Sequence, residues 1–563
     1  MKPGGNEREI FFNALWLLAL IAATSAWCLT SARNLSATFD EPTYLECGLC
    51  HWHTGSYKPL MRLGTMPLAI DVQTLPLFVW EKIHGTKIDL VRDIAWALPM
   101  ARAGTLLFWA LLLVYVFRAA HSIAGSWGGR IASALVAFEP SLLAHAALAT
   151  TDIAVTACLM LFAVEFRAGR GRGWSRAVGV PSLLYGVAIL AKASALVFAP
   201  LLMLVLECEF LSRSRAFAEI ADGGLKKRAL FLRDGLWDFR RDFFKIIGLG
   251  LLATFLYCGS DWTVERTFVE WAQTLKPGVL HNTMLWISGH LRIFTNAGEG
   301  LVQQIKHNMR GHGSFILGQE HRRAVWYYFP LALTMKSSLT FLLLPLLVAL
   351  VKPRTLWNWA CLCALLLLFY SVTCRVQIGI RFMFPLMALA SAGTGAALVV
   401  ELRGSSRMRR TVLGALLALG LAANAASAFA TWPDAVCYFN PLWGGSRAGY
   451  KLLTDSNCDW GQGLPELLAW RDAHGVEKID VWYFGLDPRA DIPPLQKISP
   501  QDAVFAHGEP VEKALRGRCV AVSTTLLYGP YLGKSPSGQA TVAFLKQRPP
   551  TARTMTYFIY DFR

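Results

Sequence analysis

Two acidic residues follow the first apolar run of the chain, in the stretch FDEPTYLECGLCHWHTGSY. Asp40 or Glu41 could act there as a general base on an acceptor hydroxyl, because a carboxylate beside a reacting group can take its proton. Helix capping is the alternative interpretation, since Asp is a favoured N-cap residue and Pro42 suits the first helical turn.

The same stretch contains Cys47 and Cys50 followed by His51, which is the spacing of covalent c-type haem attachment. Haem is disfavoured, because the motif is solitary and no later segment offers an obvious second axial ligand. A disulfide between the two cysteines is another alternative in an oxidising compartment. A divalent metal is a third, with ligands drawn from His51, His53, and Glu41 or Glu46. The simplest interpretation is that these are ordinary loop residues.

Two further ionisable residues lie at or within later apolar runs. Asp152 follows ALATT at the start of one run, where helix capping explains it equally well. Lys192 lies in the middle of another run, and a lysine costs about 3 kcal/mol at the centre of a bilayer. We therefore expect Lys192 at an interface or in a cavity, where an ammonium group can bind a phosphate.

Three more residues extend this set of polar groups at the ends of apolar segments. Arg381 lies in QIGIRFMFP, and Tyr328 and Lys336 lie in WYYFPLALTMKSS. Tyrosines at such positions are usually interfacial anchors. An ionisable residue inside a span is a candidate for a functional site. Together with the acids, these residues predict a cavity with charged groups at its mouth, which suits transfer of a group from a phosphate.

The composition places these residues in a membrane protein. The 563 residues are 54% hydrophobic and 17% charged, and the mean hydropathy is +0.38. Several uncharged runs are long enough to cross a bilayer core of about 30 Å. The net charge of +17 comes from basic residues between apolar segments, which is the positive-inside pattern. Nucleic-acid binding is not expected.

The apolar runs predict eleven membrane-spanning helices. They fall at residues 11–31, 100–118, 129–147, 150–167, two short spans within 176–208, and then 244–260, 325–351, 355–372, 378–400 and 410–430. Residues 176–208 have basic residues on both flanks, and a single span cannot return to its own side. We therefore predict a hairpin that turns at LAKASA and carries Lys192 at the outer face.

The charge pattern places the N-terminus in the cytoplasm and the end of the chain outside. The predicted organisation is a transmembrane module over 1–431 and an extracytoplasmic α/β domain over 432–563. The module has outer loops at 32–98 and 261–324 and a basic cytoplasmic loop at 209–243. Three β-like runs in the C-terminal domain are KIDVWYFG, RCVAVSTTLL and TMTYFIYDF.

Five stretches resemble the GT-C superfamily of membrane glycosyltransferases, and glycosyltransferase family 39 in particular. They are FDEPTYL, SLLAHAALATTDIAVTACLMLF, YGVAILAKASALVFAPLLML, WYYFPLALTMKSSLTFLLLPL and QIGIRFMFPLMAL. That family includes dolichyl-phosphate-mannose-protein mannosyltransferases and lipid A aminoarabinose transferases. The tail YFNPLWGGSRAGYKLLTDSNCDWGQGL is similar to a segment of bacterial members, which implies the bacterial inner membrane. The resemblance covers most of residues 1–465.

The resemblance implies an inverting transferase that uses a polyprenyl-phosphate sugar and an acceptor hydroxyl on a protein, lipid or glycan. It makes Asp40 or Glu41 the catalytic base, Asp152 the second acid and Lys192 the first candidate for the lipid phosphate. The other candidates on the donor side are Arg62, Lys58, Arg381, Tyr328 and Lys336. Tryptophan and acids are common in sugar contacts, which makes Asp455, Asp459 and Trp460 candidates on the acceptor side, with domain packing as the alternative. Some relatives use a divalent metal near the first loop, so a metal stays open.

Two other functions compete with this one. A transporter or flippase for a lipid-linked sugar would share the cavity, although it would more often show repeated halves with broken helices at matching positions. A membrane redox protein carrying c-type haem is the other alternative, and an absorption spectrum would reveal it.

Overall fold

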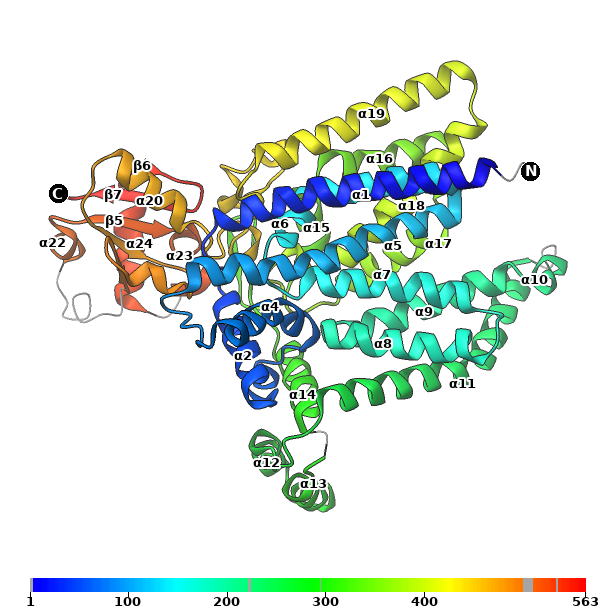
Figure 1. The fold of residues 1–563 in the computed structure, drawn as a ribbon, viewed down its shortest axis with the longest axis horizontal. Coiled ribbons are helices and arrows are strands. Elements are labelled where there is room, and N and C mark those ends of the chain that lie inside the picture. The colour runs from blue at the N-terminus through cyan, green and yellow to red at the C-terminus, as the bar shows by residue number, and fades with distance from the viewer. Residues whose placement is uncertain (1–3, 221–223, 294, 500–509, 533–534) are drawn as a thin grey trace.

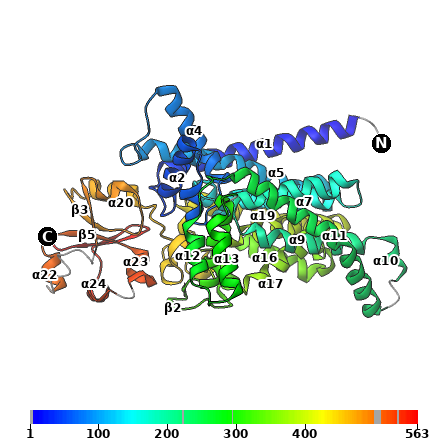
Figure 2. The same cartoon turned by 90° about the horizontal axis from the view of Figure 1, so that it is seen from below.

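The computed structural model describes residues 4–220, 224–293, 295–499, 510–532 and 535–563. Long helices run side by side along the longest axis of the molecule, and a small sheet lies beyond one end of them (Figure 1). The N-terminus lies at the far end of the helical body, whereas the C-terminus lies beside the sheet (Figures 1 and 2). The fold is a largely helical body followed by a C-terminal α/β domain, as the sequence predicts.

The helical body contains nearly all of the apolar segments. Its first half comprises α1 (Gly4–Arg33), α2 (Glu41–Thr54), α3 (Lys58–Arg62), α4 (Leu68–His84), α5 (Ile94–Ala137), α6 (Pro140–Ala146), α7 (Asp152–Gly169), η1 (Ser175–Gly179), α8 (Val180–Ala191), α9 (Ala195–Ser212), α10 (Arg215–Glu219) and α11 (Gly224–Cys258). Its second half comprises α15 (Tyr328–Lys336), α16 (Leu339–Val351), η3 (Pro353–Leu356), α17 (Trp359–Ser371), η4 (Ile380–Met383), α18 (Phe384–Gly404) and α19 (Arg407–Ala430). Between the halves lie α12 (Arg266–Gln273), α13 (Val279–His290), α14 (Thr295–Arg310) and the hairpin of β1 (Ser314–Ile316) and β2 (Gln319–His321).

Five of the described helices are long and apolar enough to cross a membrane: α1, α5, α9, α18 and α19. The pair α15 and α16 is bent by 107° and makes a sixth if it is counted as one span. The shorter apolar helices η1–α8 and α17 lie at two further predicted positions. The count of eleven spans stays a prediction, because length and composition alone support fewer.

Two predicted spans differ in detail from the structure. Gly125 has φ 70° and ψ −166°, so α5 is two helices joined at a kink. The second of these ends at Ala137, and α6 follows, so the continuous helix predicted for 129–147 is wrong. The single span predicted for 325–351 is also broken, because Ser337 and Ser338 adopt extended backbone between α15 and α16.

The predicted hairpin around LAKASA is present. Helix α8 ends at Ala191, Lys192 has extended backbone with φ −166° and ψ 138°, and α9 begins at Ala195. A long apolar segment is thereby divided into two helices that place the lysine at their junction.

The C-terminal domain contains a five-stranded mixed sheet. Its strands are β3 (Ile479–Trp482), β4 (Leu495–Ile498), β5 (Cys519–Ser523), β6 (Ala552–Arg553) and β7 (Tyr557–Asp561), in the order β4-β3-β5-β7-β6. The first three in that order are parallel, and β7 is antiparallel to both neighbours. The helices of this domain are α20 (Leu464–Ala473), α22 (Val511–Leu515), α23 (Thr524–Tyr528) and α24 (Pro536–Lys546). The three predicted β-like runs contain β3, β5 and β7.

Hydrogen bonds connect the segment that leads into the sheet to the helical body. The Lys336 ammonium donates to the backbone carbonyls of Val436, Tyr438 and Asn457 at 2.8, 2.5 and 2.5 Å. The Asn440 amide donates to the carbonyl of Thr334 at 2.6 Å. The end of α15 thus provides the Lys336 ammonium and the Thr334 carbonyl, which bind this segment.

Candidate active site

Four charged side chains from distant parts of the chain meet at the end of the helical body nearest the sheet. The Arg381 guanidinium Nη1 lies 3.2 Å from Asp40 Oδ2 and 3.7 Å from Asp152 Oδ2. The Lys192 Nζ donates to Asp152 Oδ1 at 2.6 Å. The formal charges of the four groups balance, so the cluster is a compact network of two anions and two cations.

Each of the four residues lies at a helix end or break. Asp40 precedes α2, and its side chain makes no capping hydrogen bond. Asp152 is the first residue of α7, whose N-cap Thr151 also makes no capping bond. Lys192 lies between α8 and α9, and Arg381 lies in the 3₁₀ turn η4 before α18. The helix-capping alternatives for the two acids therefore do not account for their side-chain contacts.

The cluster borders a cavity of about 310 Å³. Its polar wall includes Asp40, Lys192 and Arg381, and Asp152 lies behind them. Much of the remaining wall is apolar or aromatic: Leu196, Val197, Phe198, Phe329, Tyr370, Ile378 and Phe382. A cavity whose wall combines two cations with many apolar side chains matches a ligand with a phosphate head and a hydrocarbon chain.

Aromatic rings support the two cations. Arg381 has its guanidinium carbon 4.2 Å from the ring centre of Trp460, and Lys192 Nζ is 4.5 Å from the ring centre of Phe382. The buried His145 ring lies behind the acids, with Nδ1 3.9 Å from Asp152 Oδ2. Such cation–π contacts strengthen when the pair is removed from water, so Trp460 helps to fix Arg381.

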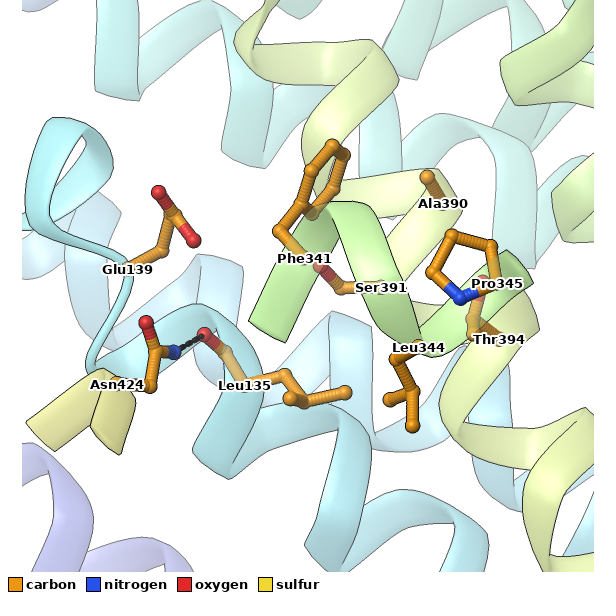
Figure 3. Close-up of a pocket in the computed structure, with 9 residues that line it drawn as sticks. All are labelled: Leu135, Glu139, Phe341, Leu344, Pro345, Ala390, Ser391, Thr394 and Asn424. Carbon is orange, nitrogen blue, oxygen red and sulfur yellow. Dashed lines mark hydrogen bonds between the residues drawn. The ribbon is translucent and has the colours of Figure 1, made fainter. Parts of the chain in front are cut away.

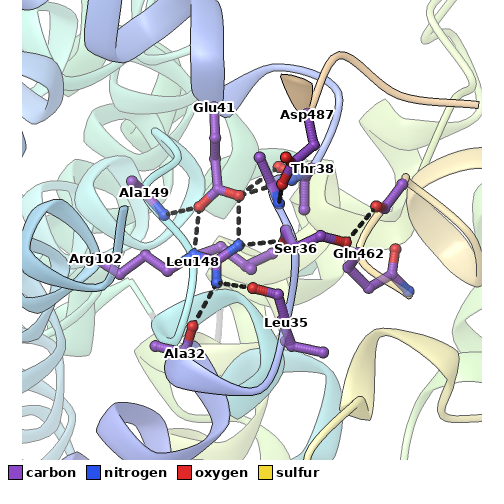
Figure 4. A network of polar contacts seen from close by, with 12 residues as sticks. Ala32, Leu35, Ser36, Thr38, Glu41, Arg102, Leu148, Ala149, Gln462 and Asp487 are labelled. Carbon is purple, nitrogen blue, oxygen red and sulfur yellow. Dashed lines mark hydrogen bonds and ion pairs between the residues drawn. The ribbon is translucent and has the colours of Figure 1, made fainter. Parts of the chain in front are cut away.

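Glu41 has a different environment from its neighbour Asp40. It is fully buried and pairs with Arg102 through bonds of 2.8 and 2.7 Å, as Figure 4 shows. It also accepts from the backbone N–H groups of Thr38 and Ala149. Arg102 in turn donates to the carbonyls of Ala32, Leu35 and Ser36. Glu41 does not line the cavity, so of the two acids only Asp40 faces it.

The structure does not bring four of the predicted donor-side residues to the cavity wall. Lys58 and Arg62 both pair with Glu265, at 3.8 and 3.5 Å. The Tyr328 hydroxyl accepts from Asn457 Nδ2 at 3.1 Å. Lys336 is buried against the carbonyls described above. Tyr328 and Lys336, both in α15, therefore bind the segment before the sheet through hydrogen bonds.

The predicted acceptor-side acids lie in the segment before the sheet, and neither lines the cavity. Asp455 has φ 59°, which is rare for a residue other than glycine, and it accepts from the Tyr531 hydroxyl. Burial raises the pKa of Asp455. Asp459 accepts from Thr525 N–H and the Ser523 hydroxyl, and burial raises its pKa to about 6. Asp459 therefore contributes to packing between the linking segment and the sheet.

The predicted metal ligands are separated in the structure. His51 stacks on Tyr57 with ring centres 3.6 Å apart, whereas His53 Nε2 lies 2.5 Å from Glu81. Within the described ranges, no group of three or more His, Cys, Asp or Glu side chains is placed to hold a metal ion. Cys47 and Cys50 lie within one helix, α2, as free thiols.

Several lining residues were not predicted from the sequence. Tyr44 comes from α2, Thr65 follows α3, and Gln304, His307 and Asn308 come from α14. Tyr44 could have been found, because it lies one turn after Asp40 in FDEPTYL. Helix α14 offers no such signal, since its polar face has the pattern of an ordinary surface helix.

A second cavity lies deeper among the helices and is much smaller. Its volume is about 20 Å³, and Glu139, Asn424 and Thr394 lie in its wall among apolar side chains (Figure 3). This is room for about one water molecule. Glu139 accepts from the Ser338 N–H and hydroxyl at 2.9 and 2.6 Å. The small cavity is therefore no substrate site.

Comparisons with known proteins are limited to structures, because no family model and no curated protein matches the sequence. ArnT from Cupriavidus metallidurans bound to undecaprenyl phosphate is similar at 14% identity and a TM-score of 0.47, covering 97% of both chains. Apo ArnT from the same organism is similar at 13% identity and a TM-score of 0.47, with the same coverage. The Archaeoglobus fulgidus oligosaccharyltransferase tethered with an acceptor peptide is similar at 11% identity and a TM-score of 0.44. The match covers 94% of this chain and 72% of the oligosaccharyltransferase chain.

ArnT, a lipid A aminoarabinose transferase, and the oligosaccharyltransferase are GT-C enzymes, the superfamily that the sequence motifs resemble. Identities this low with TM-scores below 0.5 do not assign an activity to this chain. Its function has to be judged from its own side chains.

Proposed function

We propose that this protein is an inverting glycosyltransferase that moves a sugar from a polyprenyl-phosphate donor to an acceptor hydroxyl. The observation that carries the proposal is the convergence of Asp40, Asp152, Lys192 and Arg381 beside a cavity with many apolar side chains in its wall. The cavity suits the lipid phosphate and the first part of its chain. Asp40 is the acid exposed to the space where a sugar would extend.

The proposed reaction is a single displacement at the anomeric carbon. The acceptor oxygen attacks that carbon, and its proton passes to Asp40 as general base. The bond between the anomeric carbon and the phosphate oxygen breaks, and its electron pair leaves with the polyprenyl phosphate. Lys192 and Arg381 stabilise the negative charge on that leaving group. Asp152 holds both cations in place in the absence of the phosphate.

The direction of approach follows from the same arrangement. The lipid phosphate binds from the apolar side, between α9, α14 and α17, and the acceptor enters from the side of the C-terminal domain. We place this site at the outer face of the membrane, in keeping with the charge pattern of the loops. Asp455, with its unusual backbone and its Tyr531 contact, is our candidate for the acceptor side.

Release of free polyprenyl phosphate tests the proposal. The purified protein is incubated with a panel of radiolabelled polyprenyl-phosphate sugars and a membrane extract as acceptor source. Labelled acceptor and free polyprenyl phosphate should form in equal amounts, and Asp40→Asn should slow the formation of both at least about 100-fold. Movement of intact sugar-lipid across vesicles, with no bond cleavage, would instead indicate the transporter.

A further inference from the structure

An exposed apolar surface lies on the helices between the two halves of the bundle. Val279, Leu280 and Trp286 of α13 are 86, 63 and 65% exposed. Val279 and Trp286 are seven residues apart, so they lie on one face of the helix. No Asp, Glu, Lys or Arg occurs between Lys276 and Arg292. Three large apolar side chains of this short helix are therefore exposed, and no charged side chain lies among them.

The position of this surface distinguishes it from an ordinary exposed loop. Helices α12 and α13 project sideways from the body, beside α14 and away from the long axis of the bundle (Figure 1). They follow directly on α11, whose exposed side carries Leu249, Leu252 and Leu256 along one face. Helices α12 and α13 thus lie beside α14, at the end of the helical body where the cavity lies (Figure 1).

We propose that α12 and α13 form a lipid-contacting wing that lies in the interfacial layer of the membrane. Interfacial helices combine an apolar face with tryptophan and flanking basic residues. Trp286, stacked on His290 at 4.8 Å, supplies the aromatic residue, and Lys276 and Arg292 flank the uncharged stretch. The absence of charged side chains along α13 favours lipid over a polar protein surface as its occupant.

The wing is joined to the cavity wall through α14. The Thr267 hydroxyl of α12 donates to Glu299 of α14, and Gln303 Nε2 donates to the same carboxylate at 2.6 Å. Asn296 at the start of α14 donates to the Cys258 carbonyl and to Asp261. One turn beyond Gln303, α14 lines the cavity. Lipid bound to the wing thus stabilises the position of α14, the helix that forms one side of the cavity.

Photo-crosslinking in lipid nanodiscs tests the wing without relying on enzymatic activity. The full-length protein carries p-benzoylphenylalanine in place of Trp286, and a matched protein carries it in place of Trp470. Trp470 also stacks on a histidine four residues later, at 4.4 Å, but it is half-buried and lies in the C-terminal domain. After illumination, intact mass spectrometry measures the fraction of protein bearing one added phospholipid.

We expect several-fold more phospholipid adduct at position 286 than at position 470. Equal adduct at the two positions would overturn the proposal, as would crosslinking at 286 to a second copy of the chain instead of to lipid. A third protein with the crosslinker in place of Leu280 repeats the test if the first does not fold. Because the readout is a lipid adduct, its failure would leave the proposed transferase activity untouched.

Discussion

Arg381 is held between the helical body and the C-terminal domain by Trp460, whose ring centre lies 4.2 Å from the guanidinium carbon. The same guanidinium lies 3.2 Å from Asp40. The aromatic face thus turns the arginine toward the cavity, where its charge can meet a phosphate. The segment DSNCDWGQ, which precedes the sheet, therefore forms part of the support of the site.

Trp460→Ala should weaken binding of polyprenyl phosphate about tenfold or more, because a desolvated cation–π contact contributes about 2 kcal/mol. Trp460→Phe keeps an aromatic face and should recover most of the affinity. Binding is measured by titration of the purified protein with polyprenyl phosphate. Equal affinity of the Ala and Phe variants would show that the ring does not position Arg381.

Asp40→Asn should reduce sugar transfer by about 100- to 10,000-fold, the range that general base catalysis contributes. Its affinity for polyprenyl phosphate should change little, because the two cations remain. Single-turnover transfer and lipid binding are measured on the same preparation. Near-normal transfer would remove Asp40 from the role of base.

Asp152→Asn and Lys192→Ala should have opposite effects on phosphate binding. The first leaves Lys192 and Arg381 with one anion fewer, so polyprenyl phosphate should bind at least as tightly while transfer slows. The second removes a cation and should weaken binding. Titration at two salt concentrations checks both variants. Weaker binding in the Asp152 variant would show that Asp152 does not compete with the phosphate for the two cations.

Glu41→Gln should destabilise the helical body by about 3 kcal/mol, since it leaves Arg102 as a buried charge without its partner. Thermal unfolding in detergent measures the change. The matched variant Asp40→Asn, one residue away, should shift the midpoint far less. A similar loss in both variants would mean that the Glu41–Arg102 pair is not a special source of stability.

Asp434 predicts a pH dependence of stability. Burial raises its pKa from 3.8 to about 6, so the folded state binds the proton more tightly than the unfolded chain. The stability from this group is complete below about pH 4 and is lost as pH rises through about 6. Relative to Asp434→Asn, the native protein should lose about 2–3 kcal/mol between pH 4 and pH 8. A difference in the free energy of unfolding between the two proteins that stays the same at every pH would contradict this prediction.

The position of Lys192 could be predicted because the charge pattern restricts it. Basic residues on both sides of 176–208 require the chain to return, and a lysine belongs at the turn. Asp152 and Arg381 were likewise found from their places at the ends of apolar runs. These predictions depend on local polarity and chain direction, which a sequence carries directly.

The choice between Asp40 and Glu41 could not be made in the same way. Consecutive residues at the start of a helix point in different directions, and the partner that buries Glu41 is Arg102, on another helix. Lys336 was expected near the phosphate because it is charged and lies in an apolar segment. Its acceptors are carbonyls about a hundred residues later in the chain, and only the folded chain brings them together.

The contacts at the bend between α15 and α16 also determine whether the helical body can be separated from the C-terminal domain. Lys336 ends α15 with its ammonium enclosed by three carbonyls that belong to the segment before the sheet. A truncation after residue 431 would leave that charge without acceptors and would remove the ring beneath Arg381. The helical body is thus no autonomous catalytic core, and the two parts have to be expressed, exchanged and engineered as one unit.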